Sequence, residues 1–136
     1  MSILTIHTDG GARGNPGPAA VGVVLESGDF HLEHGRHIGD ATNNVAEYTG
    51  VIDALDRVAE LEIPVTELHF FLDSELVVRQ ILGQYRVKEI TLQALHAEVL
   101  KKLRATGLPY RFTHVRREQN KLADKLVNQT LDGVLH

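Results

Sequence analysis

The order of strand-like and helix-like segments along the chain restricts its fold more than any other feature. Alternating hydrophobic and polar residues predict three strands near the N-terminus, at residues 1–8, 20–27 and 30–38. Beyond them, helical periods and strand periods alternate. Helices are predicted at residues 45–59, 75–82, 92–105 and 120–131, and strands at residues 65–72 and 110–115. Antiparallel strands followed by crossover connections predict an α/β fold with a mixed five-stranded sheet flanked by helices.

Two local signals define the expected boundaries around the first helix. The segment GGARGNPGPAA at residues 10–20 separates the first two strands and is predicted to be a loop, since glycine and proline interrupt regular elements. Asn44 is predicted to cap the first helix, with Glu47 three residues later in the capping-box position. Asp53, Asp56, Arg57 and Glu60 are expected to form the polar face of that helix.

Length and composition predict one globular domain over residues 1–136. The chain is 43% hydrophobic and 24% charged, an ordinary balance for a protein with a packed core. The absence of cysteine excludes a disulfide scaffold, a thiolate zinc site and a cysteine nucleophile. The N-terminal residues do not have the pattern of a signal peptide, and no apolar run reaches the roughly 20 residues of a membrane span. We therefore expect a soluble, cytoplasmic protein.

Charge is divided unevenly along the sequence. The net charge of −4 combines −10 in residues 1–78 with +6 in residues 79–136. One interpretation is a carboxylate site in one region and cations for a polyanion in another; the other is simply two solvated helix faces.

Two acidic residues come directly after predicted strands. Asp9 follows the first strand, and Asp73 follows the strand at residues 65–72. Ligands gather at the carboxyl ends of strands in open sheets, so neighbouring strands would bring both carboxylates into one site. The alternatives are local roles, an Asp-Gly turn at Asp9 and a helix cap at Asp73 or Ser74.

Two further acids lie on predicted helices. Glu47 falls on the apolar side of its helix, where a carboxylate is costly unless it is paired, although a capping box would satisfy it in part. Asp124 lies at the edge of the apolar face of the last helix and is uninformative alone. A cluster of such carboxylates suits Mg²⁺ or Mn²⁺, and two ions of this kind support in-line phosphodiester hydrolysis.

Four sequence blocks resemble a known family. They are TDGGARGNPGPAAVG at Thr8–Gly22, ATNNVAEYTGVIDAL at Ala41–Leu55, FLDSELVV at Phe71–Val78 and HVRREQNKLADKLVNQ at His114–Gln129. Their order and content resemble type 1 ribonuclease H over nearly the whole chain. The resemblance implies a ribonuclease H-like fold and cleavage of the RNA strand of an RNA–DNA hybrid without sequence specificity. It also implies two Mg²⁺ ions, with Mn²⁺ as a possible substitute, and products with 5′-phosphate and 3′-hydroxyl ends. We expect a free-standing monomer.

The resemblance also implies the roles of individual residues. Asp9, Glu47, Asp73 and Asp124 match the family's metal-binding carboxylates, with Asp9 bridging both ions. Asp124 would complete the site of the water-activating ion, and Glu47 and Asp73 would serve the other. Residues matching positions that contact RNA 2′-hydroxyls and base edges are Gly10, Asn15, Asn43, Asn44, Glu47 and Ser74. Thr42 and Asn43 match a pocket for a DNA phosphate. The alternative for Asn43 and Asn44 is helix entry, and for Asn15 a turn.

The sequence departs from many family members in two respects. A basic, tryptophan-containing protrusion is missing, because residues 83–90 lead directly to the next helix and the chain has no tryptophan, so weaker hybrid binding is expected. Arg116 and Arg117 are candidates for another phosphate-binding surface, as are Lys101, Lys102 and Arg104, although a lysine-rich helix face is often only solvated.

The second departure concerns a mobile histidine that assists turnover in the family. His114 has matching spacing before Asp124 but is expected to end a strand and to be packed in place. Arg117 is the alternative for the electrostatic part of that role, although it would not titrate near neutral pH.

Two other functions were weighed against an active nuclease. A protein that binds hybrid or structured RNA but cleaves it poorly would fit the missing protrusion. A mononucleotide-binding enzyme built on Gly10–Gly17 is disfavoured, because that segment does not end in the Gly-Lys-Ser/Thr of a P-loop.

Overall fold

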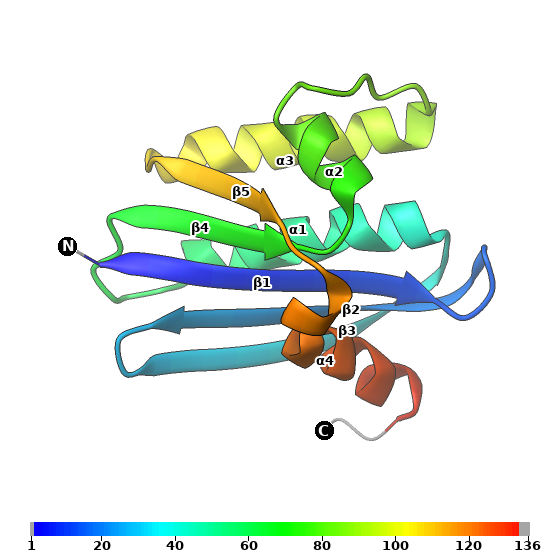
Figure 1. Cartoon of the computed structure of the whole chain (residues 1–136), viewed down its shortest axis with the longest axis horizontal. Helices are drawn as coiled ribbons and strands as arrows, with labels where there is room; N and C mark the ends of the chain where they lie inside the picture. Colours follow the sequence, from blue (N-terminus) through cyan, green and yellow to red (C-terminus); the bar gives the residue numbers. More distant parts are fainter. Residues whose placement is uncertain (1, 134–136) are drawn as a thin grey trace.

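A computed structural model describes residues 2–133 and contains a five-stranded mixed sheet (Figure 1). The strand order is β3-β2-β1-β4-β5. The strands are β1 (Ile3–Ala12), β2 (Gly17–Ser27), β3 (Phe30–Ala41), β4 (Glu67–Leu72) and β5 (Tyr110–His114). The first three pair in antiparallel fashion, and β4 and β5 continue the sheet in parallel with β1. The prediction of a mixed five-stranded sheet is confirmed.

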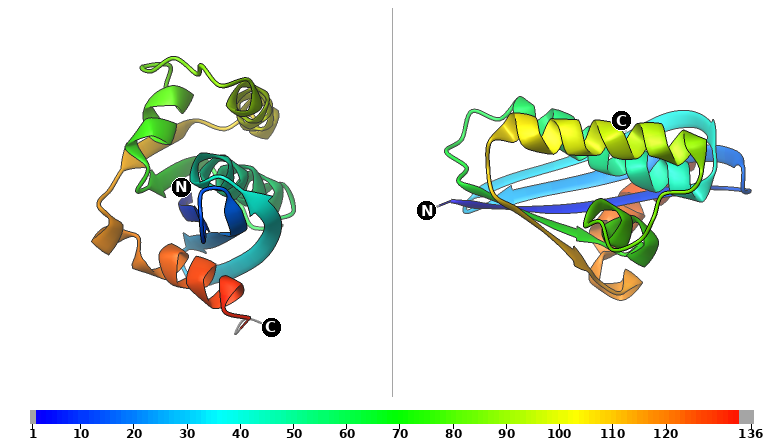
Figure 2. Two further views of the ribbon diagram at one scale, coloured as in Figure 1. Left: turned by 90° about the vertical axis from the view of Figure 1, so that its right-hand side faces the viewer. Right: turned by 90° about the horizontal axis from the view of Figure 1, so that it is seen from above.

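Helices cover both faces of the sheet (Figure 2). They are α1 (Asn43–Ala59), α2 (Glu75–Ile81), α3 (Ile90–Thr106) and α4 (Lys121–Leu131), with a short 3₁₀ helix η1 (Arg117–Gln119) before α4. Helix α1 packs on β1 and β2 and against α3, whereas α4 packs on β1, β2 and β3 from the opposite side. Among the described residues, no helix is long and apolar enough to cross a bilayer.

The main hydrophobic core lies between the sheet and helices α1 and α3. Alternate residues of β1 and β4, among them Leu4, Ile6 and Phe70, point into it and are fully buried. Helix α4 is held by a separate, much smaller cluster in which Ala123 and Leu126 pack against Val24 of β2. Two layers of unequal size therefore stabilise the two sides of the sheet.

The loop predicted between the first two strands is much shorter than expected. Strand β1 continues through Gly10 and Gly11 to Ala12, which pairs with Ala19 of β2, and only four residues form the turn. Glycine is needed at position 10 because a Cβ there would lie 2.1 Å from the carbonyl oxygen of Ala46. The glycine that weakens a strand in general here allows helix α1 to approach the sheet.

The first helix begins earlier than the sequence suggested. Thr42, not Asn44, is the N-cap, and its hydroxyl accepts a hydrogen bond from the amide of Val45. Glu47 is therefore not in a capping-box position and its carboxylate is left for another role. Asp53, which was expected on the polar face of this helix, is instead buried and accepts two hydrogen bonds from Arg36 of β3, at 2.8 Å each.

Candidate active site

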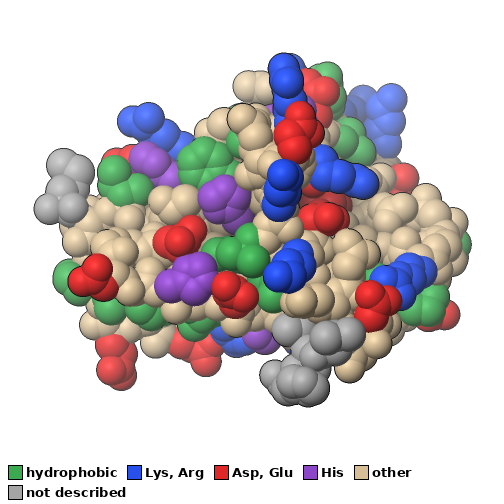
Figure 3. Space-filling model, turned by 60° about the horizontal axis from the view of Figure 1, so that its bottom comes forward, with side chains coloured by type: hydrophobic (Ala, Val, Ile, Leu, Met, Phe, Trp, Pro, Cys, Tyr) green, Lys and Arg blue, Asp and Glu red, His purple; other side chains and the backbone are tan. Residues whose placement is uncertain are grey.

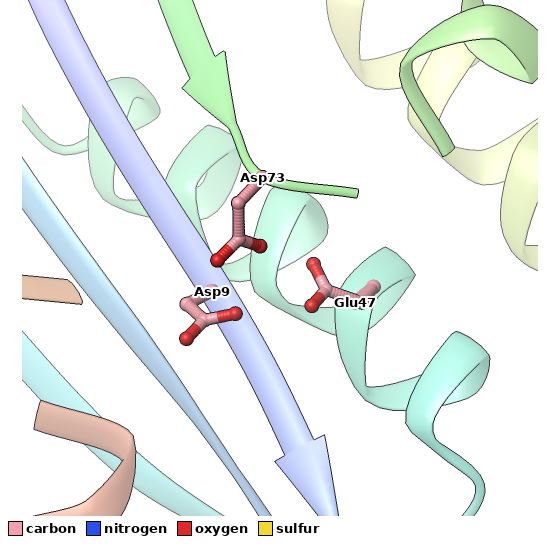
Figure 4. Close-up of side chains that lie close together, drawn as sticks. All are labelled: Asp9, Glu47 and Asp73. Atoms are coloured by element: carbon pink, nitrogen blue, oxygen red, sulfur yellow. The ribbon is translucent and has the colours of Figure 1, made fainter. Parts of the chain in front are cut away.

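Two neighbouring strands and one helix bring three carboxylates together (Figure 4). Asp9 lies on β1 and Asp73 directly follows β4, and these parallel strands are in register with Thr8 opposite Leu72. Glu47 projects from the second turn of α1 toward both. Each of the three side chains offers an oxygen, and these oxygens all lie within 4.8 Å of one another. The predicted convergence of Asp9 and Asp73 is confirmed, as is the placement of Glu47 on the inner side of its helix.

The three carboxylates are largely removed from solvent. Asp9 is 6% exposed and Glu47 is 9% exposed. The amide of Gly10 donates to Asp9 Oδ1 at 2.9 Å. Glu47 Oε2 and Asp73 Oδ2 are buried without a hydrogen-bond partner. Buried carboxylate oxygens without partners are costly, so the site is built for a ligand that supplies positive charge.

Burial and mutual repulsion raise the pKa values of all three groups. The pKa of Asp9 is raised to about 7, first by burial and then by the charge of Asp73. Burial and the neighbouring Asp9 raise the pKa of Glu47 well above its ordinary value. The pKa of Asp73 is raised mainly by burial, an effect that the nearby guanidinium of Arg117 opposes. A divalent cation would relieve this repulsion, and a set of carboxylate oxygens suits Mg²⁺ or Mn²⁺.

Asp124 enters the same groove from the other side of the sheet. It lies in the first turn of α4, and the amide of Asn120 just before that helix donates from Nδ2 to the Thr8 carbonyl at 2.9 Å. This bond fixes the start of α4 beside Asp9. The groove has a volume of about 500 Å³ and includes all four carboxylates. Among the described residues, only Asp9, Glu47 and Asp73 form the close group, so Asp124 stands apart from it.

Comparison with known proteins identifies the family. A family described as "Reverse transcriptase-like" matches residues 7–130. The chain is 43% identical over 129 residues to "Ribonuclease HI" of Halobacterium salinarum, covering 93% of this chain and 63% of that protein. The chain belongs to the ribonuclease H family. It is 39% identical over 133 residues to "Bifunctional protein Rv2228c" of Mycobacterium tuberculosis, covering 96% of this chain but 36% of that protein. The chain thus spans about a third of the mycobacterial relative.

Solved structures agree with this assignment. The crystal structure of LC11-RNase H1 in complex with RNA/DNA hybrid has a TM-score of 0.89 and 41% identity, covering 98% of this chain and 99% of that one. The crystal structure of RNase H1 from Halobacterium salinarum NRC-1 has a TM-score of 0.88 and 40% identity, with 96% and 98% covered. The fold is therefore the ribonuclease H-like fold that the four sequence blocks implied.

Several predicted substrate-binding residues of this ribonuclease H domain lie at the groove and also stabilise its walls. Gly10, Asn43, Asn44 and Ser74 line it. The amide of Asn43 donates to Asn15 Oδ1 at 3.0 Å, and Asn43 Oδ1 accepts from the amide of Ala12 at 2.9 Å. The Ser74 hydroxyl caps α2 by accepting from the amide of Val77. The structural roles weighed for these residues are thus real and compatible with substrate contact.

Of the three candidates Arg116, Arg117 and His114, only Arg117 lines the groove. The Nε atom of Arg117 lies 4.0 Å from Asp73 Oδ2. Arg116 does not line the groove; its side chain is 82% exposed and makes a long 3.9 Å contact with Glu118. His114 ends β5, as predicted, but is exposed rather than packed in place; its charge would lower the pKa of Asp73.

The lysine-rich segment of α3 lies away from this site. Lys101, Lys102 and Arg104 are near the C-terminal end of α3, whereas the groove is at the carboxyl ends of β1 and β4 (Figure 1). Lys102 is also paired with Asp56 of α1 at 2.6 Å. On the face shown in Figure 3, most Lys and Arg side chains gather instead in the right half, with acidic side chains between them.

Sequence reasoning did not single out two residues that shape the groove. Asn120 is almost fully buried and fixes α4, and it was present in the fourth block without a stated role. Arg13 lines the groove from the turn after β1. An asparagine at the start of the predicted last helix was a usable signal for Asn120, whereas nothing in the local pattern around Arg13 indicated a partner.

Proposed function

We propose that this protein is a metal-dependent endonuclease that hydrolyses the RNA strand of RNA–DNA hybrids. The observation that carries the proposal is the buried group of Asp9, Glu47 and Asp73, whose oxygens lie within 4.8 Å of one another. The similar LC11-RNase H1, which was crystallised with an RNA/DNA hybrid, supports the choice of substrate.

The chain has residues suited to two ions. Asp9 would bridge both, Glu47 and Asp73 would hold one, and Asp124 would complete the site of the other. Such ions supply an activated water and neutralise charge on the phosphate. The protein holds these carboxylates in place. Asp9 lies on β1, Asp73 directly follows the paired strand β4, and Asn120 holds the helix that carries Asp124 beside β1.

The reaction is a phosphodiester hydrolysis. Water oxygen forms a bond to phosphorus while the bond between phosphorus and O3′ breaks, and a proton is taken up by O3′. The products are one strand with a 3′-hydroxyl and one with a 5′-phosphate. The guanidinium of Arg117 beside Asp73 is placed to stabilise negative charge at the phosphate, a role that needs no titration near neutral pH.

Recognition of RNA requires short polar groups close to the 2′-hydroxyl. Asn44 and Ser74 present such groups at the groove, and Gly10 exposes backbone beside Asp9. Thr42 and Asn43, at the start of α1, would hold a phosphate of the DNA strand. Asn15 supports this arrangement by accepting a hydrogen bond from the amide of Asn43.

The groove has a neighbouring hollow, which favours a polymeric substrate. A second hollow of about 540 Å³ shares Asn44 with the first and is lined by Tyr85, Arg86 and Lys88. It lies at the eight-residue connection between α2 and α3, where no additional helix is inserted. Two cations and an exposed aromatic ring are suitable contacts for a nucleic-acid backbone and a base or sugar.

The test is cleavage of an end-labelled RNA–DNA hybrid with Mg²⁺ and with Mn²⁺, beside a duplex-RNA control. We expect metal-dependent cutting of the RNA strand in the hybrid, and its loss in Asp73→Asn. The matched control is Asp56→Asn, which removes the same charge from a residue paired with Lys102 outside the groove. Hybrid binding without cutting would favour the alternative of a binding protein, and cutting that persists in Asp73→Asn would place the chemistry elsewhere.

Two further properties stay predictions. A monomer is expected from the sequence, and the elution volume of the purified protein would test this. The cytoplasmic location expected from the sequence is likewise open to test by fractionation.

A further inference from the structure

Arg13 occupies a position at the rim of the active-site groove that the proposed chemistry leaves unexplained. It lies in the short turn between β1 and β2, and its side chain lines the groove together with residues of α4. Its Nη1 contacts Asp132 Oδ1, at the C-terminal end of α4, at 2.6 Å. Both side chains of this ion pair are about half exposed, at 48% and 51%.

The backbone of Arg13 is fixed by hydrogen bonds, whereas its side chain is half exposed and held by a single ion pair. The amide of Arg13 donates to the carbonyl of Pro18 at 2.8 Å, which closes the turn. On either side of it, Ala12 and Asn15 are hydrogen-bonded to Asn43 at the start of α1. The guanidinium can therefore exchange one partner for another near the groove without a change in the fold.

The electrostatics of the groove require a cation in this region. An incoming phosphodiester strand meets four carboxylates, and among the described residues that line the groove only Arg13 and Arg117 are basic. Arg117 faces Asp73, whereas Arg13 is paired with an acid outside the carboxylate group. An exposed ion pair contributes little free energy, while an arginine can bind phosphate through two parallel hydrogen bonds. Exchange of Asp132 for a phosphate is thus favourable.

We propose that Arg13 binds a backbone phosphate of the cleaved strand on the α4 side of the acidic group, and that Asp132 competes for it in the free protein. The proposal rests on the proposed function, because it names a contact for the same substrate. Arg13 acts in binding and positioning and does not touch the reacting atoms. Asp132 therefore lowers affinity for the substrate, so the two members of one ion pair have opposite effects.

The experiment measures the affinity of a fluorescent RNA–DNA hybrid over a range of salt concentrations. Asp73→Asn is the cleavage-deficient parent, and Arg13→Ala, Arg13→Lys and Asp132→Ala are added to it. We expect Arg13→Ala to weaken binding roughly tenfold and to reduce the salt slope by about one counterion. Arg13→Lys should keep the slope and part of the affinity, and Asp132→Ala should tighten binding several-fold. Arg57→Ala, which removes an arginine paired with Glu60 on α1, is the matched control and should change only stability.

Two results would overturn the proposal. Unchanged affinity and salt slope in Arg13→Ala would show that the guanidinium does not meet a phosphate. Equal weakening by Arg13→Ala and Asp132→Ala, accompanied by equal losses in the free energy of unfolding, would show that the pair only fastens the turn to α4. If the parent binds no hybrid, the proposed function itself fails, a result that is distinct from a loss confined to the Arg13 variants.

Discussion

At the scale of single residues, the acidic group stores repulsion that a bound cation would release. Asp9 and Glu47 are nearly buried, and the pKa values of both are raised mainly by burial. In the metal-free protein, this favours the protonated forms in the folded state over the unfolded state. The free energy of unfolding should therefore depend both on pH and on metal binding at this site.

Metal-free Asp9→Asn should therefore gain stability relative to the original protein as pH rises. The folded pKa of Asp9 is about 7, above its unfolded value of 3.8. The protonated group stabilises the fold below the unfolded pKa, and this contribution is lost as pH rises through the folded pKa. The difference in free energy of unfolding between variant and original should grow from about pH 4 to pH 7 and then level off, as measured by urea titration with EDTA.

Adding Mg²⁺ provides the control for this prediction. At pH 8, Mg²⁺ should raise the urea midpoint of unfolding of the original protein far more than that of Asp9→Asn. An ion that binds only the folded state stabilises that state. A difference between the two proteins that is the same at pH 4 and pH 8 would contradict the raised pKa.

Site residues could be predicted from the sequence where their position within a strand or helix indicated their role, but not where the role depends on a partner in a distant segment. Asp9 and Asp73 were predicted from position, since each follows a strand, and Glu47 was found from the helical period. Asp53 has the same chemical type and lies on the same helix as Glu47. Its burial depends on Arg36, which reaches it from β3. A contact between an edge strand and a helix leaves no periodic signal in either segment.

At the scale of elements, the close approach of α1 to β1 sets the distance between Glu47 and Asp9. Gly10 allows this contact, and Gly50 adds a second, with its missing Cβ 3.0 Å from the Asp9 carbonyl oxygen. For the same reason, the loop predicted over residues 10–20 proved too long, since only residues 13–16 lie outside the strands. Glycine is depleted in strands in general, but the tertiary contact that requires it here is formed by residues far away in the sequence.

Gly10→Ala should therefore be far more damaging than Gly11→Ala. A Cβ at position 10 would lie 2.1 Å from the Ala46 carbonyl oxygen, whereas one at position 11 would make an ordinary 3.5 Å contact with Val127. We expect Gly10→Ala to lose about 1–3 kcal/mol or more of stability and most of its cleavage activity, because Glu47 moves away from Asp9. Urea unfolding and the hybrid cleavage assay measure the two effects. Similar losses in both variants would show that this contact does not set the site.

At the scale of the whole molecule, the acidic and basic parts of the sequence are only partly separated in the folded structure. The acidic first part supplies Asp9, Glu47 and Asp73, but the basic second part is split between two ends of the sheet. Arg117 lines the groove and Arg116 directly precedes it in the chain, while the C-terminal end of α3 lies at the opposite end of the sheet (Figure 1). The charge division along the chain fitted either a polyanionic partner or two solvated helix faces, and it could not show which cations lie near the carboxylates.

Position should accordingly matter more than charge for hybrid binding. Arg116→Glu should weaken binding roughly tenfold and lower its salt dependence, because a guanidinium that is 82% exposed and adjacent in the chain to Arg117 of the groove lining is replaced by an acid. Arg104→Glu makes the same change in net charge on α3 and should have a much smaller effect. Equal effects of the two substitutions in a binding titration would favour a general role of net charge.

The last of the four carboxylates is carried by the final described helix, which is anchored by a cluster separate from the main core. The main core holds β1, β4 and α1, and with them Asp9, Glu47 and Asp73, whereas the docking of α4 depends on this small cluster and on the hydrogen bond from Asn120 to Thr8. On the proposed function, detachment of α4 alone would remove Asp124 and silence the enzyme while the rest of the fold stays intact.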